Sequence, residues 1–243
     1  MSRRLAFGVV CLLAAGAIGL AAVLLLRGGE KRRPAARTVR PRQEQVRDLV
    51  ARVPVGETIA LRQRPGGRIL ARVGDRTEFG SVQTLGVALK RGPWLAVRSP
   101  ALGNTRLGWV DGRRLRLLHR SVWIDVDLSA RTLSLVERGT IYRRDAVGIG
   151  ATDTPTPTGT FYVTDKLPGP RFGPYYGCCI LALSGRQPHL PHGWSGGDRL
   201  AIHGTPTPTF GQAVTNGCIH LPDVVLTVLM KDVPLGARVA IHR

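Results

Sequence analysis

Several residue types are scarce in this chain, and each shortage excludes a class of protein. The 243 residues include only four cysteines, spread from position 11 to position 218, which excludes a disulfide-dense secreted scaffold. Aromatic residues make up 5% of the chain, which is few for a protein that stacks nucleic-acid bases. Wholesale disorder is also excluded, because 43% of the residues are apolar and only 21% are charged.

Acidic residues are scarce as well, with 16 Asp and Glu against 35 Lys and Arg, so the formal net charge is +19. Residues 1–47 alone hold ten basic and two acidic side chains. Such a charge suits an anionic membrane surface, an anionic cell wall or a nucleic acid, and it is equally typical of a solvated surface. The basic run at 31–42 contains no aromatic residue and adjoins an apolar segment. We therefore expect contact with the anionic cell envelope and no nucleic-acid partner.

The apolar segment is Leu5–Leu26, a run of 22 residues without a charge. A helix of that length spans roughly 33 Å, enough to cross a bilayer core. Arg3 and Arg4 precede the run, and no small-residue cleavage site stands next to its end at Arg27. The sequence therefore predicts a retained membrane anchor over 1–26. Residues 27–47, with prolines, many charges and no apolar period, predict a flexible basic tether.

Short apolar runs separated by Gly and Pro fill residues 48–118, among them Ile69–Val73 and Trp94–Val97. This pattern predicts a small all-β, barrel-like module. The stretch Leu107–Val110 resembles the end of a bacterial SH3-like domain, a module often attached to cell-wall enzymes. The alternative is a spacer with no ligand of its own.

A second, mostly β domain is predicted over 121–243. In Val122–Leu128, apolar side chains alternate with Asp125 and Asp127, which is the period of a half-buried strand. A turn at 129–131 and a returning apolar run complete a predicted hairpin. One short helix is predicted from Pro222 and Asp223, since proline and an acidic residue favour a helix start. Further strands are predicted at 146–150, 160–163, 175–183, 200–203 and 237–241.

The residues best suited to catalysis are Cys218 and His203. A thiol is a nucleophile only as thiolate, and both a neighbouring imidazole and a helix N-terminus lower its pKa. Cys218 lies four residues before the predicted helix, and His203 ends a predicted strand. Gly217 would leave backbone N–H groups open to an oxyanion. For the pair Cys178 and Cys179 we expect free thiols, one buried and one outward, because a vicinal disulfide would be strained. The histidines lack metal-ligand spacing, so no metal or cofactor is expected.

Two short segments, Ile202–Thr205 and Thr215–Ile219, resemble the signature of the L,D-transpeptidase catalytic domain. Thr156–Phe161 and Phe172–Tyr175 agree with that family. The resemblance implies a β-sandwich-like fold and acyl transfer on peptidoglycan through a cysteine thioester, without metal or cofactor. It also implies site roles: Cys218 as nucleophile, His203 as base, Gly204 as the carbonyl that orients the imidazole, Asn216 and Gly217 as oxyanion-hole backbone, and Tyr175, Thr215 and His220 as substrate contacts.

Two positions depart from the family pattern. Asn216 stands where many members have His, and His220 stands where many have Arg and others Asn. Because histidine is only partly protonated near neutrality, His220 predicts weaker or pH-dependent substrate binding, and His220→Arg is expected to raise activity above pH 7. An L,D-carboxypeptidase, with water as acceptor, and a non-catalytic wall-binding scaffold are the alternatives.

The resemblance also bears on the location of the protein. Basic residues after the apolar run outnumber those before it, which by the positive-inside rule alone would keep the C-terminal part in the cytoplasm. Long domains translocate largely regardless of such charges, and peptidoglycan lies outside. We therefore predict a single-pass protein of the bacterial cell membrane with its catalytic domain extracytoplasmic.

Overall fold

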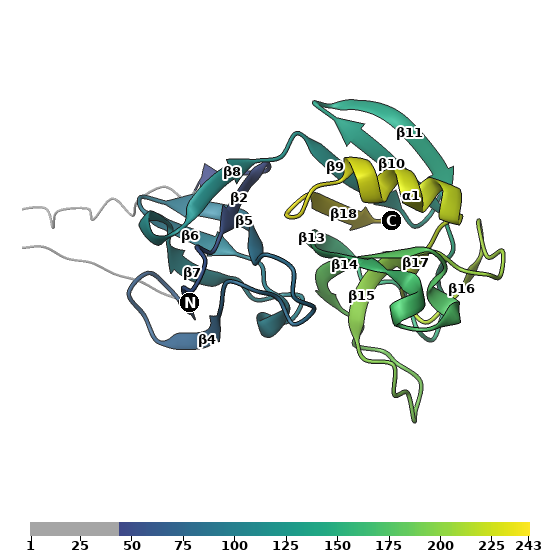
Figure 1. The fold of residues 1–243 in the computed structure, drawn as a ribbon, viewed down its shortest axis with the longest axis horizontal. Coiled ribbons are helices and arrows are strands. Elements are labelled where there is room, and N and C mark those ends of the chain that lie inside the picture. Colours follow the sequence, from purple (N-terminus) through teal and green to yellow (C-terminus); the bar gives the residue numbers. More distant parts are fainter. Residues whose placement is uncertain (1–43) are drawn as a thin grey trace, which may run out of the picture. The chain divides into compact units, whose positions relative to one another are not determined.

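The computed structural model describes residues 44–243, so the predicted membrane anchor and nearly all of the predicted tether lie outside the described residues. Within 44–243 the fold is mostly β, with one α-helix near the C-terminus (Figure 1). No helix in this part of the chain is long and apolar enough to span a membrane. The strands form two eight-stranded sheets and one two-stranded ladder.

The N-terminal sheet has the strand order β4-β3-β7-β6-β5-β2-β8, with β1 paired to β5. Its core consists of alternate apolar residues such as Leu61, Val87 and Leu95, all of them buried. Glu44 and Gln45, which the sequence places in the tether, form β1 through backbone pairing with Leu89 and Lys90. The strands are β1 (Glu44–Gln45), β2 (Leu49–Arg52), β3 (Ile59–Arg62), β4 (Ile69–Val73), β5 (Thr84–Arg91), β6 (Trp94–Val97), β7 (Gly108–Asp111) and β8 (Arg116–His119).

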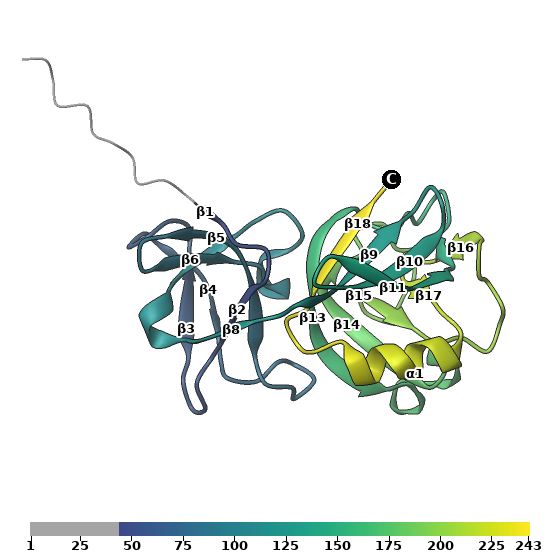
Figure 2. The ribbon, with the colours of Figure 1, turned by 90° about the horizontal axis from the view of Figure 1, so that it is seen from above.

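The C-terminal sheet has the order β11-β10-β9-β18-β13-β14-β15-β17, and Figure 2 shows β18 between β9 and β13. The predicted hairpin over 122–136 is confirmed as β9 and β10. The strands are β9 (Val122–Asp127), β10 (Thr132–Glu137), β11 (Thr140–Ala146), β13 (Gly159–Pro168), β14 (Cys179–Arg186), β15 (Arg199–His203), β17 (Ile219–His220) and β18 (Arg238–His242); β12 (Ile149–Gly150) and β16 (Ala213–Thr215) form the two-stranded ladder.

This sheet is one continuous, curled ladder, whereas the family resemblance implies a sandwich-like arrangement. The long strand β13 accounts for the difference. Its residues Gly159–Tyr162 pair with β18, and Val163–Pro168 pair with β14, with a register shift after Val163. Because one bent strand belongs to both halves, the two halves stay hydrogen-bonded to each other.

The helix α1 (Asp223–Asp232) buries Val225, Leu226 and Leu229 in the core beneath the sheet. Pro222 is its N-cap, so the helix begins at Asp223, one position later than the predicted first helical residue, Pro222. The predicted strand over 175–183 is wrong in its first half. Pro174–Tyr176 form a 3-10 turn, and β14 begins only at Cys179.

Candidate functional site

The predicted site residues gather around a cavity of about 720 Å³. Strands β15 and β17 run parallel at its floor, with His203 paired to His220. Tyr175 stands at the rim, with 77% of its surface exposed. Trp194, on the loop between β14 and β15, lines the cavity as well. The predicted residues that line it are Tyr175, His203, Thr215, Asn216, Cys218 and His220.

His203, the last residue of β15, is held in a fixed orientation. Its Nδ1 lies 2.6 Å from the carbonyl oxygen of Gly204. A carbonyl only accepts hydrogen bonds, so Nδ1 carries the proton and Nε2 is left free to receive one. The ring packs between Tyr176 and His220, with centroid distances of 4.9 and 4.5 Å. Burial lowers the pKa of His203, so the resting imidazole is neutral at neutral pH.

Cys218 ends a tight turn that Thr215 closes. The Thr215 hydroxyl donates to the Cys218 carbonyl at 2.6 Å and accepts from the Gly217 N–H at 3.0 Å. Thr215 is also buried, with 4% of its surface exposed. In this structure the hydroxyl of Thr215 therefore shapes the turn, and its role as a substrate contact stays a prediction.

Gly217 needs to be glycine for two reasons. Its φ is +106°, and a Cβ would overlap the amide of Gln187. Its own N–H donates to the Thr215 hydroxyl, and its predicted place in the oxyanion-hole backbone stays a prediction. Asn216 is exposed, and its backbone carbonyl accepts a hydrogen bond from Gln187 Nε2 at 3.1 Å.

Gln187 is a site residue that sequence reasoning misses. Its buried amide also donates to the carbonyls of Thr154 and Pro155, and its Oε1 accepts from the His189 N–H. It thereby joins three loops behind the Cys218 turn. A lone glutamine after an apolar run carries no sequence signal, because its partners lie about 30 residues away on either side.

The Cys218 thiol lies among apolar side chains, packed against the cluster that includes Ile180, Ala182 and Ala201. This burial raises the pKa of the thiol to about 11, although a hydrogen bond at the Ala201 backbone opposes the shift. Sequence reasoning expects a lowered pKa, whereas burial raises it. The resting site therefore holds a neutral thiol, 3.9 Å from the Arg199 carbonyl, and a neutral imidazole.

His220 is fixed by a contact between its Nδ1 and the Thr209 hydroxyl, 3.0 Å apart. Burial, with a smaller contribution from His203, lowers the pKa of His220 to about 4. The imidazole is therefore neutral at pH 7, which corrects the partial protonation expected from the sequence. A neutral His220 can exchange hydrogen bonds with a substrate but lacks the charge of an arginine.

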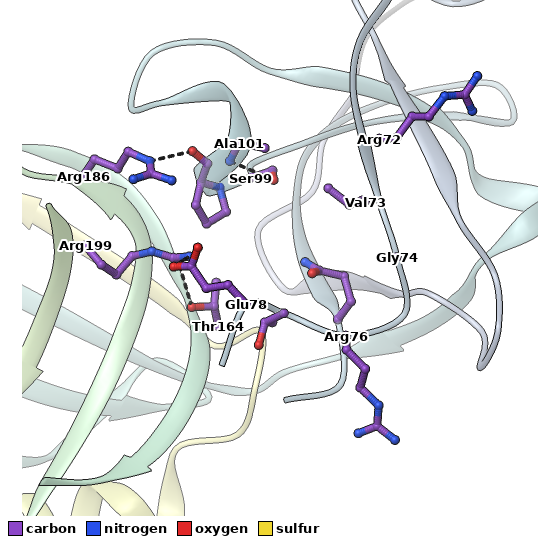
Figure 3. A pocket seen from close by; sticks show the side chains of 13 residues that line it. Arg72, Val73, Gly74, Arg76, Glu78, Ser99, Ala101, Thr164, Arg186 and Arg199 are labelled. Atoms are coloured by element: carbon purple, nitrogen blue, oxygen red, sulfur yellow. Dashed lines mark hydrogen bonds and ion pairs between the residues drawn. The ribbon is translucent and has the colours of Figure 1, made fainter. Parts of the chain in front are cut away.

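Arg199 and Arg186 line a second cavity of about 250 Å³, where both reach residues of the N-terminal sheet region (Figure 3). Arg199 donates to Glu78 at 2.6 Å and to the Leu183 carbonyl at 3.0 Å. Arg186 donates to the Pro100 carbonyl at 2.9 Å and pairs with Asp198. These arginines already have partners, so they brace the start of β15.

Cys178 and Cys179 form a disulfide with each other, which corrects the expectation of two free thiols. The bond joins Cys178, two residues after the 3-10 turn, to Cys179, the first residue of β14. Among residues 44–243, no group of three or more His, Cys, Asp or Glu side chains could hold a metal ion.

Comparison with known proteins decides the family. The model of the L,D-transpeptidase (YkuD) catalytic domain matches residues 121–241. This domain belongs to the L,D-transpeptidase family. The protein named L,D-transpeptidase YkuD in Bacillus subtilis is 33% identical over 123 residues, and its namesake in Bacillus licheniformis is 34% identical over 119 residues. Each alignment covers 49% of this chain, and they span 65% and 64% of those relatives.

Among solved structures, an L,D-transpeptidase from Mycobacterium smegmatis is 18% identical, with a TM-score of 0.41, over 65% of this chain and 93% of its own. The family match begins at residue 121, so the L,D-transpeptidase domain starts just before β9. The SH3-like nature of the N-terminal sheet stays a prediction.

Proposed function

We propose that this protein is a peptidoglycan L,D-transpeptidase in which Cys218 carries the acyl group. One observation supports the proposal above all. The free thiol of Cys218 and the imidazole of His203 line the same cavity of an L,D-transpeptidase domain. The Gly204 carbonyl binds the imidazole at Nδ1, which leaves Nε2 unprotonated and able to accept a proton. A cysteine and a base arranged in this way are the minimum for nucleophilic acyl transfer.

In the first half-reaction, the Cys218 thiol gives its proton to His203 Nε2, and sulfur attacks the carbonyl carbon of the third residue of a tetrapeptide stem. The C–N bond to the terminal D-Ala then breaks, and His203 returns the proton to the leaving amine. The Cys218 N–H is the backbone donor proposed for the oxyanion, because the Gly217 N–H is already bonded to Thr215.

In the second half-reaction, the side-chain amine of a neighbouring stem attacks the thioester. The C–S bond breaks, and His203 transfers the amine proton to the Cys218 thiolate. The product is a crosslink between two third residues. Water in place of the amine would make the same site an L,D-carboxypeptidase. Tyr175 and the neutral His220 are the proposed substrate contacts at this cavity.

We further propose that residues 5–26 anchor the protein in the bacterial membrane and that the basic residues of 27–47 contact the anionic envelope. Two sequence features support this location: the uncharged run of 22 residues, and the ten basic side chains within 1–47. A peptidoglycan substrate requires the catalytic domain to lie on the outer side.

The test compares wild type, Cys218→Ala and Cys178→Ser/Cys179→Ser, each incubated with a disaccharide-tetrapeptide and analysed by mass spectrometry. We expect released D-Ala and crosslinked dimer from wild type, a thioester adduct on Cys218, and neither product from Cys218→Ala. The double serine variant is the control: it should keep its activity, which would show that the loss in Cys218→Ala is specific to Cys218. Released D-Ala without dimer would favour the carboxypeptidase. No adduct and no product from wild type would favour the scaffold.

A further inference from the structure

Asp223 occupies a place that the helix alone does not explain. It is the first residue of α1, where an acidic side chain favours the helix dipole. Its carboxylate nevertheless turns away from its own helix. Oδ2 accepts a hydrogen bond of 2.9 Å from the backbone N–H of Cys178, which is 45 residues distant in sequence. The side chain therefore ties the start of α1 to the segment that precedes β14.

The other carboxylate oxygen of Asp223 lies against two glycines. A Cβ added to Gly204 would overlap Asp223 Oδ1, and a Cβ added to Gly177 would overlap the same atom. The added Cβ of Gly177 would also lie 2.6 Å from the Cα of Gly204. These three residues thus pack with no room for a single methyl group.

Gly204 is the residue that orients the imidazole. Its carbonyl accepts from His203 Nδ1 at 2.6 Å, and its own N–H donates to the Cys179 carbonyl at 3.2 Å. Asp223 contacts Gly204 directly and also holds the N–H of Cys178, the neighbour of Cys179. Both the position of Gly204 and the segment to which Gly204 is bonded therefore depend on one carboxylate.

We propose that Asp223 is a positioning residue for His203, acting through Gly204 and the segment 177–179. The Cys218 turn leads through β17 into α1, so the same side chain fixes the thiol-bearing segment relative to the imidazole. With Asp223 in place, the Gly204 carbonyl selects the Nδ1–H tautomer, and Nε2 can take the thiol proton. Without it, the tautomers mix, and the Nε2–H form cannot act as base. The consequence for catalysis rests on the transpeptidase function proposed above.

The experiment compares Asp223→Ala and Asp223→Asn with Asp127→Ala in the full chain. Asp127 is a matched control, because its Oδ1 accepts a backbone N–H from Ala130 at 2.9 Å in the β9–β10 turn. The first readout is the ¹⁵N spectrum of the imidazoles at pH 7, with His203 assigned from a His203→Gln variant. The second readout is kcat and KM for crosslinking. Tyr176, His220 and Cys218 surround His203 and stay unchanged in every variant.

We expect wild type and Asp127→Ala to show the Nδ1–H tautomer of His203, and Asp223→Ala to show a mixture. We expect kcat to fall about 10- to 100-fold in Asp223→Ala with KM little changed, as for a misplaced catalytic group. Asp223→Asn keeps the shape of the side chain and one acceptor oxygen, so its kcat is expected to lie between those of wild type and Asp223→Ala. It keeps the test valid if the alanine variant fails to fold.

Unchanged imidazole signals and an unchanged kcat in Asp223→Ala would overturn the proposal. A fall in kcat no larger than that of Asp127→Ala would overturn it as well. The spectrum does not depend on any substrate. A tautomer change in Asp223→Ala alongside a wild-type protein that makes no crosslink would therefore refute the transpeptidase function and leave the positioning role standing.

Discussion

Cys218 shows how one residue's surroundings set its chemistry. Burial raises the pKa of its thiol to about 11, so the thiol is protonated at neutral pH. We expect alkylation of Cys218 by iodoacetamide, in a Cys11→Ser background, to be slow at pH 7 and to keep rising above about pH 9. Mass spectrometry of the modified peptide gives the rate at each pH. A plateau reached below pH 7 would show a resting thiolate and contradict this account.

His220 links the site to stability at acid pH. Its pKa is lowered to about 4 in the folded state, whereas an unfolded histidine titrates near 6.5. The unfolded state therefore binds the proton first, and stability is lost as the pH falls from about 6.5 towards 4. We expect a loss on the order of 3 kcal/mol from this group. Denaturant unfolding of wild type and His220→Gln at pH 7 and pH 4 measures it, and the glutamine variant should lose less stability. Equal losses would rule out this contribution.

At the residue scale, sequence alone could name the candidate thiol and imidazole but not the side chains that hold them in place. Cys218 and His203 stand out because thiol and imidazole chemistry is rare in this chain, and the structure brings them to one cavity. The committed hydroxyl of Thr215 and the carboxylate of Asp223 emerge only from the structure. Thr215 accepts from the N–H of Gly217, two residues on, and Asp223 accepts from the N–H of Cys178, 45 residues away. Residue types alone do not show that either side chain turns to the backbone in this way.

At the scale of elements, α1 has a simple energetic test. Leu226 is fully buried against the sheet, whereas Val224, two residues earlier, is 75% exposed. We expect Leu226→Ala to lower the free energy of unfolding by about 2 to 5 kcal/mol, since it leaves a cavity. Val224→Ala should change it by about 0.5 kcal/mol or less. Urea unfolding measures both, and a Leu226→Ala loss no greater than that of Val224→Ala would refute this packing.

Elements with a clear two-residue period were predictable, as the hairpin of β9 and β10 shows. Elements whose shape depends on the strands that they pair with were not predictable. β13 bends because its two halves pair with different strands, and the run before β14 is broken by the turn at Pro174–Tyr176. Apolar residues on both sides of such a break look like one strand in the sequence.

At the scale of the whole molecule, the two sheets touch where a glycine makes room for an aromatic ring. A Cβ on Gly86, in β5, would overlap the ring of Tyr162, in β13, whose hydroxyl donates to the Val87 carbonyl at 3.3 Å. We expect Gly86→Ala to destabilise the protein by about 1 to 3 kcal/mol, because the ring must move. Gly74→Ala, which meets open space, is the control. Equal denaturant midpoints for the two variants would contradict this contact.

The place of β18 has a consequence for how the protein is made. Residues 238–242 pair with β9 on one side and β13 on the other, so they join the two halves of the catalytic sheet. A ribosome reaches these residues more than a hundred positions after β9, and until then neither half has its central partner. The nascent domain therefore stays incomplete through most of its synthesis. Cys218 and His203 therefore reach their final arrangement only after the last strand has been added.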